Sequence, residues 1–123
     1  VPNARDRREF ALMGHEKIEA SFESAQAIAM QLMKMNPLLG AQAARQMLTS
    51  ATALMSLAAS GTVGEAMTRQ AALIRAITQS AASASRLSGS TARVAQRGLK
   101  PIHARATANA RRLGKLDQRR SSP

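Results

Sequence analysis

The side chains that could do chemistry are few in this sequence and are poorly placed to act together. His15 lies beside Glu16 and one helical turn before Glu19, and a histidine and a carboxylate on adjacent turns can bind a metal ion, but no third ligand is evident. The second histidine, His103, follows Pro101 and stands far from the first. We interpret both as ordinary structural residues; His103 could also meet a local carbonyl or a phosphate.

The remaining catalytic signals are also missing. Glu16, Glu19 and Glu23 recur at about one helical turn, but without a pocket they are most simply a solvated face. No glycine-rich phosphate loop, dinucleotide fingerprint or nucleophile elbow occurs, and the absence of cysteine excludes disulfides and thiolate metal sites. We expect a protein that is not an enzyme, with no catalytic site, no metal site and no cofactor.

The pattern of apolar residues predicts helices that must lie against something. Between Glu16 and Met35 the apolar residues follow a heptad seam, with Glu16 and Glu23 nearly opposite. No strand-type alternation occurs, so the class is all-α. Alanine supplies much of the 45% apolar content, which predicts a thin core that partner helices or an apolar surface would complete. The seam consists of Ile18, Phe22, Ala25, Ala29 and Leu32.

Proline, glycine and capping signals divide the chain into helices at residues 6–35, 38–59, 63–97 and 101–113. Thr62 and Glu65 match a capping box, and Pro101 suits the first turn of the last helix. At Asn36-Pro37 the second helix either folds back as a hairpin or continues with a kink, and we favour a kink or tight corner. We expect one domain, residues 1–115, built as a helical hairpin, a three-helix bundle or a coiled-coil-like rod. Residues 116–123 are expected to form a disordered basic tail.

Charge separates two halves of the chain. Residues 1–66 carry six basic and six acidic side chains, whereas residues 67–123 carry twelve basic side chains and only Asp117, which accounts for the net charge of +11. Such asymmetry favours an anionic partner for the second half, such as nucleic acid, an anionic lipid surface or an acidic protein, although a solvated basic face is the simpler alternative. The second half has no aromatic residue, which argues against stacking on single-stranded nucleic acid.

All seven methionines precede residue 68, in or beside the neutral half. Methionine is flexible and is common on surfaces that bind irregular partners, but it also fills the cores of helical bundles, and we leave both interpretations open. No run of 18 apolar residues predicts a membrane span, and the amino terminus lacks an apolar signal core. We expect a cytoplasmic protein. The chain starts with Val1, which leaves open that it is a trimmed fragment.

Two stretches resemble the phasins, small helical proteins that coat polyhydroxyalkanoate storage granules. Residues 17–30 (KIEASFESAQAIAM) are similar to the opening helix of that family, and residues 98–113 (GLKPIHARATANARRL) look like a carboxy-terminal block of phasin-like sequences. The resemblance covers roughly residues 5–115. It implies a non-enzymatic surfactant whose apolar helix faces lie on the polymer, with self-association through coiled-coil-like helices and, in some members, non-specific DNA binding. The strong positive charge is a departure, because a polyester coat does not obviously require it.

These observations favour a granule-coating structural protein, located at the storage-granule surface, that forms a homo-oligomer when no granule is present. The alternative is a basic helical nucleoid protein that binds duplex DNA without sequence preference. For granule or oligomer contact we predict the apolar residues Phe10, Ile18, Phe22, Leu32, Leu48, Leu54, Met55 and Ile74. For anion or DNA contact we predict the basic residues Arg93, Arg97, Lys100, Arg105, Arg111 and Arg112.

Overall fold

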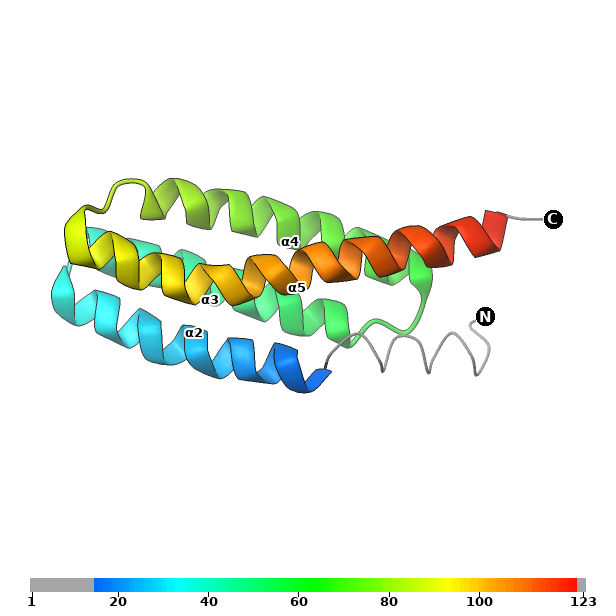
Figure 1. Cartoon of the computed structure of the whole chain (residues 1–123), viewed down its shortest axis with the longest axis horizontal. Helices are drawn as coiled ribbons and strands as arrows, with labels where there is room; N and C mark the ends of the chain where they lie inside the picture. Colours follow the sequence, from blue (N-terminus) through cyan, green and yellow to red (C-terminus); the bar gives the residue numbers. More distant parts are fainter. Residues whose placement is uncertain (1–14, 122–123) are drawn as a thin grey trace.

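A computed structural model describes the backbone of residues 15–121 and the side chains of residues 17–115. This part of the chain forms four helices and no strand: α2 (His15–Met35), α3 (Leu39–Ala58), α4 (Val63–Ala84) and α5 (Gly89–Ser121). Helices α2 and α4 run in one direction and α3 and α5 in the other (Figure 1). Each helix packs against the next and α5 returns to α2, which closes a four-helix bundle. The predicted all-α class is confirmed, as is helical packing into a bundle.

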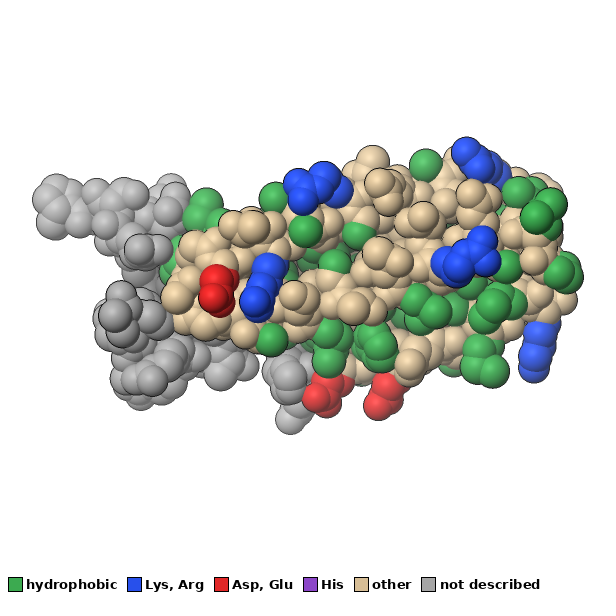
Figure 2. All heavy atoms as spheres, turned by 180° about the vertical axis from the view of Figure 1, so that it is seen from behind, with side chains coloured by type: hydrophobic (Ala, Val, Ile, Leu, Met, Phe, Trp, Pro, Cys, Tyr) green, Lys and Arg blue, Asp and Glu red, His purple; other side chains and the backbone are tan. Residues whose placement is uncertain are grey.

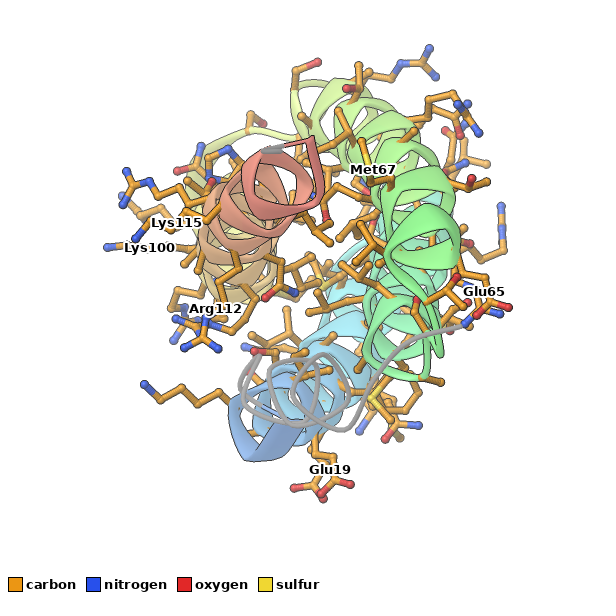
Figure 3. All side chains as sticks on the ribbon, turned by 90° about the vertical axis from the view of Figure 1, so that its right-hand side faces the viewer. Glu19, Glu65, Met67, Lys100, Arg112 and Lys115 are labelled. Carbon is orange, nitrogen blue, oxygen red and sulfur yellow. The ribbon has the colours of Figure 1, made fainter. Side chains whose placement is uncertain are left out.

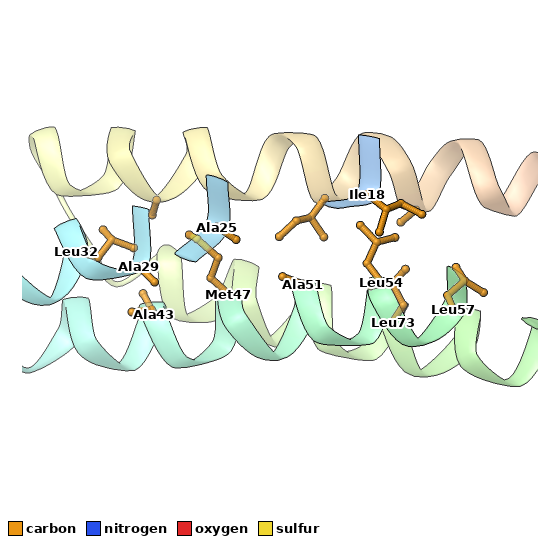
Figure 4. Close-up of a cluster of buried hydrophobic side chains, with 14 of the residues drawn as sticks. Ile18, Ala25, Ala29, Leu32, Ala43, Met47, Ala51, Leu54, Leu57 and Leu73 are labelled. Atoms are coloured by element: carbon orange, nitrogen blue, oxygen red, sulfur yellow. The ribbon is translucent and has the colours of Figure 1, made fainter. Parts of the chain in front are cut away.

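Four of the five residues of the heptad seam of α2 are buried inside this bundle, and the fifth, Phe22, is half-buried at the edge of the core. Ile18 and Leu32 are both fully buried. Ile18 lies beside Leu54 of α3 and Leu73 of α4, whereas Leu32 lies near Ala43 at the other end of the core (Figure 4). Nine of the twenty buried apolar side chains in the described part of the chain are alanine. An alanine buries far less apolar area than a leucine, so the predicted thin core is present. The small side chains also bring the helices close together.

One polar cluster lies within this core, between α3 and α4. The Oγ atoms of Ser50 and Ser80 are 2.6 Å apart, and Ser80 Oγ also donates to the carbonyl of Gln46 at 2.8 Å. Both serines are buried, at 0% and 1% exposure. Because each hydroxyl has a partner, the cluster avoids the cost of unpaired polar groups and fixes how α3 lies along α4.

The chain reverses completely between α2 and α3. Asn36 Oδ1 accepts hydrogen bonds from the backbone N–H groups of Leu38 (3.1 Å) and Leu39 (2.9 Å), which caps the start of α3. Gly40 then lies directly against the backbone carbonyl of Leu32, where a Cβ would overlap it. Of the two arrangements left open by the sequence, the structure therefore has the antiparallel hairpin, and a kinked continuation is wrong.

The connection between α3 and α4 confirms the capping signal. The Glu65 backbone N–H donates to Thr62 Oγ1 at 3.0 Å, as an N-cap requires. The Glu65 carboxylate accepts from the Gly61 N–H at 2.8 Å, one residue earlier than in the usual box. Arg69 then donates to the carbonyl of Ser56 at 2.9 Å, which ties α4 to the end of α3.

The predicted boundary between the third and fourth helices, 63–97 and 101–113, is wrong. Helix α4 ends at Ala84, and α5 starts at Gly89, whose φ of 59° lies in the left-handed region that glycine adopts readily. Helix α5 then continues through both Gly98 and Pro101. A proline inside a helix removes one backbone donor, and here the packing of α5 on its neighbours holds the helix across that gap.

The remaining boundaries agree with the sequence or fall outside the described residues. The predicted helix 38–59 corresponds to α3, and α2 ends at Met35 as expected. Residues 116–121, which we expected to be disordered, continue the backbone of α5. The start of the predicted helix 6–35, including Phe10, lies outside the described residues, as do residues 122–123.

Candidate functional site

The structure divides the predicted apolar contact residues into three groups. Ile18, Leu32 and Leu54 are fully buried, so they cannot reach a partner while the bundle is closed. A second group packs at the edge of the core and is half-buried, and Ile74 is 46% exposed on α4. The half-buried residues are Phe22, Leu48 and Met55.

The half-buried residues lie on the outer side of the α2–α3 hairpin. On α2, Met33 and Met30 fall within about a quarter turn of Phe22 and are 39% and 58% exposed. They lie on the side of α2 away from α5, because Gln31, on the opposite side, borders α5. We call Phe22, Met30, Met33, Leu48 and Met55 the apolar strip.

The α3 members of the apolar strip lie on the side of α3 that packs against α2. Ser50, on the other side of α3, contacts Ser80 of α4, so Leu48 and Met55 lie on the side toward α2. Figure 2 shows apolar side chains gathered over this half of the molecule. Leu38, 79% exposed at the α2–α3 corner, extends the apolar surface to the end of the bundle.

All six predicted basic residues lie on the single helix α5. Arg93, Arg97, Lys100 and Arg111 recur at helical spacing along its exposed side, and Lys115 continues the row. We call these five residues the basic stripe; it extends roughly 33 Å, given 1.5 Å per residue. Arg105, half-buried, and Arg112, exposed, lie on a neighbouring side of α5. Figure 3 shows Lys100, Lys115 and Arg112 projecting outward from the same helix.

The part of the chain between Glu65 and Asp117 has no acidic side chain that could balance the basic stripe. Residues 66–116 contain neither aspartate nor glutamate. Glu19 and Glu65 point away from α5 (Figure 3). One side of the bundle therefore presents concentrated positive charge, which attracts polyanions or anionic surfaces.

A groove with partly apolar walls follows α4 and α5, and its larger cavity also borders Gln31 of α2. An open cavity of about 860 Å³ has Ile77, Ala81 and Leu99 in its lining, together with basic residues of α5. Farther along, a cavity of about 240 Å³ is lined by Met67 and Leu113, among others. Gln70 also joins the two helices, since its Nε2 donates to the carbonyl of Ala106 at 2.9 Å. We call this the α4–α5 groove.

The histidines and possible metal ligands form no site in the described residues. His103 is exposed and borders the larger cavity, while the side chain of His15 lies outside the described residues. No three His, Cys, Asp or Glu side chains converge between residues 17 and 115. Over the part of the chain that the structure covers, no helix has the length and apolarity to cross a membrane.

The sequence missed the exposed apolar residues Met30, Met33, Leu38 and Met67 as individual contact candidates. The available signal was the concentration of methionine before residue 68, which left core and surface roles equally open. The structure has methionines in both places: Met47 lies in the core and is 1% exposed, whereas Met30 lies on the surface and is 58% exposed.

Comparison with known proteins adds no relative, because no family model, no curated protein and no solved structure matches this chain. The phasin resemblance therefore stays a prediction, and the surfaces described above are the basis for assigning a function.

Proposed function

We propose that this protein is a non-enzymatic coat protein of polyhydroxyalkanoate granules, located at the granule surface. The observation that supports this most directly is the apolar strip on the α2–α3 hairpin, together with the exposed corner residue Leu38. Large apolar side chains grouped on one face are typical of surfaces that bind an apolar partner. A polyester surface offers apolar contact without demanding specific hydrogen bonds.

Two modes of attachment fit this fold. In the first, the apolar strip and Leu38 contact the polymer while the bundle stays closed. In the second, the bundle opens and Ile18, Leu32 and Leu54 exchange their contacts with sister helices for contacts with the polymer. The alanine-rich core makes opening less costly than it would be with larger buried side chains.

Localisation in polyester-accumulating cells tests the proposal. A fluorescent fusion of the full chain is expected to ring the granules, and the variant Met30→Gln/Met33→Gln/Leu38→Gln to become largely diffuse. These three side chains are 58%, 39% and 79% exposed, so the variant keeps its core. Met67→Gln, at a similarly exposed site (45%) on α4, is the matched control and should still localise. Diffuse wild-type fluorescence in cells full of granules would contradict the proposal.

Co-sedimentation with isolated granules at low and high salt separates apolar from electrostatic attachment. Apolar contact survives high salt, whereas attachment through the basic stripe is screened. We expect the wild-type protein to stay bound in high salt, and its complete release would show that charge alone holds it.

The same apolar strip is proposed to pair between copies of the chain when no granule is present, giving a homo-oligomer. Light scattering after size exclusion is expected to show a mass above 13.1 kDa that falls toward the monomer in the Met30→Gln/Met33→Gln variant. A wild-type monomer at all concentrations would contradict this part of the proposal.

A second candidate function is sequence-independent binding of duplex DNA, which the basic stripe favours. Because α5 is continuous, its cations form one row instead of being divided between two helices. Phosphate contacts release counterions, so binding should weaken steeply with salt. Replacing Arg93 and Lys100 with glutamine should weaken binding equally for unrelated sequences and reduce the salt dependence. A salt dependence unchanged by these substitutions would exclude the stripe as the contact surface.

A further inference from the structure

The α4–α5 face has exposed apolar residues, and the basic stripe projects from the adjoining outer side of α5, with Lys100 and Lys115 directed away from α4 (Figure 3). Neither function proposed above requires that combination. Met67 is 45% exposed and Ile74 is 46% exposed. They are seven residues apart and so lie on the same side of α4. Met67 lines the smaller cavity with α5 residues, which places this side toward α5, and Figure 3 shows Met67 between the two helices.

Further apolar residues line the larger cavity beyond Ile74. Ile77 and Ala81 of α4 and Leu99 of α5 line the larger cavity, where Lys100 and His103 also contribute. The groove therefore has apolar walls along much of its length and cationic side chains on its α5 side. Residues 66–116 contain no acidic side chain that would repel an anion here.

We infer that the α4–α5 face docks on an anionic phospholipid surface, with the basic stripe meeting the headgroups and Met67 and Ile74 entering the headgroup–acyl boundary. Interfacial helices bind membranes by this combination of an apolar face and flanking cations, and both terms add to the affinity. The negative surface potential of anionic lipids attracts cationic side chains that lie within about a Debye length of the surface.

The apolar residues favour a lipid surface over a nucleic acid at this face. A duplex presents charged phosphates and sugars to a protein that lies along its backbone, and these give Met67 and Ile74 no apolar contact. A lipid surface satisfies the cations and the apolar side chains together. The inference does not rest on the granule proposal, because the apolar strip lies on the opposite α2–α3 face.

Sedimentation with vesicles tests the inference on the full chain. The probes are vesicles of phosphatidylcholine alone and of phosphatidylcholine with about a third phosphatidylglycerol. We expect binding to the anionic vesicles only, weakened roughly tenfold or more in Met67→Gln/Ile74→Gln, since each substitution removes a large apolar side chain from the contact. Replacing Arg93, Lys100 and Arg111 with glutamine should abolish binding.

Matched controls keep the outcomes distinct. Met30→Gln/Met33→Gln on the opposite face should bind anionic vesicles as the wild type does, and circular dichroism melts should show that all variants remain folded. No binding to anionic vesicles would overturn the inference. It would also be overturned if Met67→Gln/Ile74→Gln bound them as tightly as the wild type, because the stripe would then be a general polyanion site. Failure here leaves granule attachment untouched, and loss of granule localisation leaves vesicle binding untouched.

Discussion

Gly98 is the residue at which α5 approaches α3 across the bundle. A Cβ at this position would lie 2.5 Å from Met47 Sδ and 3.0 Å from Ile28 Cγ2. We expect Gly98→Ala to lower the free energy of unfolding by about 1–3 kcal/mol, the usual cost of overpacking a core. The helix propensity of alanine, better by roughly 1 kcal/mol, reduces that loss without reversing it. Urea denaturation followed by circular dichroism measures the difference.

Gly114 provides the matched control on the same helix. A Cβ there would meet nothing within 4 Å, so Gly114→Ala gains helix propensity without a clash and should be neutral or stabilising by up to about 1 kcal/mol. Equal effects at the two glycines would show that Gly98 is not at a close contact.

Ser50 and Ser80 form a coupled buried pair, and their substitutions should not be additive. The two hydroxyls contact each other at 2.6 Å, and both also bond the Gln46 carbonyl, Ser50 at 3.1 Å and Ser80 at 2.8 Å. Either single change to alanine removes the contact between the hydroxyls and should cost about 1 kcal/mol, whereas replacing both removes that contact only once and should cost less than the sum. A double-mutant cycle in urea measures the coupling, and strictly additive losses would contradict the pairing.

Helix α4 depends on its first turn for a defined start. Thr62 accepts a hydrogen bond from the Glu65 N–H at 3.0 Å, so Thr62→Ala should destabilise the protein by about 1 kcal/mol. Thr78, exposed in the middle of the same helix, is the control. Its hydroxyl bonds only the carbonyl of Ile74 one turn back, and Thr78→Ala should be neutral or stabilising in the same thermal melts. A loss at Thr78 equal to that at Thr62 would show that the cap contributes nothing special.

The helix boundaries that the sequence predicted correctly are those set by local chemistry. The capping box at Thr62 and the break after Asn36 act through hydrogen bonds within a few residues, so they can be read without knowing the fold. Gly98 and Pro101 are locally valid stop signals too, but packing of α5 on three other helices overrides them. Conversely, the sequence placed Gly89 inside a helix predicted over residues 63–97, because its left-handed φ depends on how α4 and α5 meet.

At the scale of the whole molecule, the spacing of the apolar residues predicted that they share one face of a helix, but not what that face contacts. The spacing of Ile18 and Leu32 establishes that they share a side of α2, but not whether that side meets sister helices or a partner. The order of the helices determines which side chains are buried, because α2 has α3 on one side and α5 on the other. These neighbours bury the centre of the apolar face and leave Met30 exposed at its edge. Four of the five residues of the basic stripe were predicted individually and Lys115 was not, and the continuity of the stripe follows from the single helix α5.

The charge distribution of the whole molecule predicts how its stability responds to salt. The net charge of +11 arises in residues 67–123, so like charges repel one another along α5 in the folded state. Arg93, Arg97 and Lys100 are about one helical turn apart, as are Arg111 and Lys115. The Debye length falls from about 30 Å at 0.01 M salt to about 8 Å at 0.15 M, so added salt screens this repulsion. Raising sodium chloride over this range should therefore raise the urea midpoint of the wild type. Arg93→Gln/Arg97→Gln/Lys100→Gln should have a higher midpoint than the wild type at low salt and a smaller rise, so that the two curves converge. Lys34→Gln, in the neutral first half, is the control, and its urea midpoint should change with salt as that of the wild type does. If the midpoints of all three proteins rise in parallel with salt, repulsion along α5 does not limit stability.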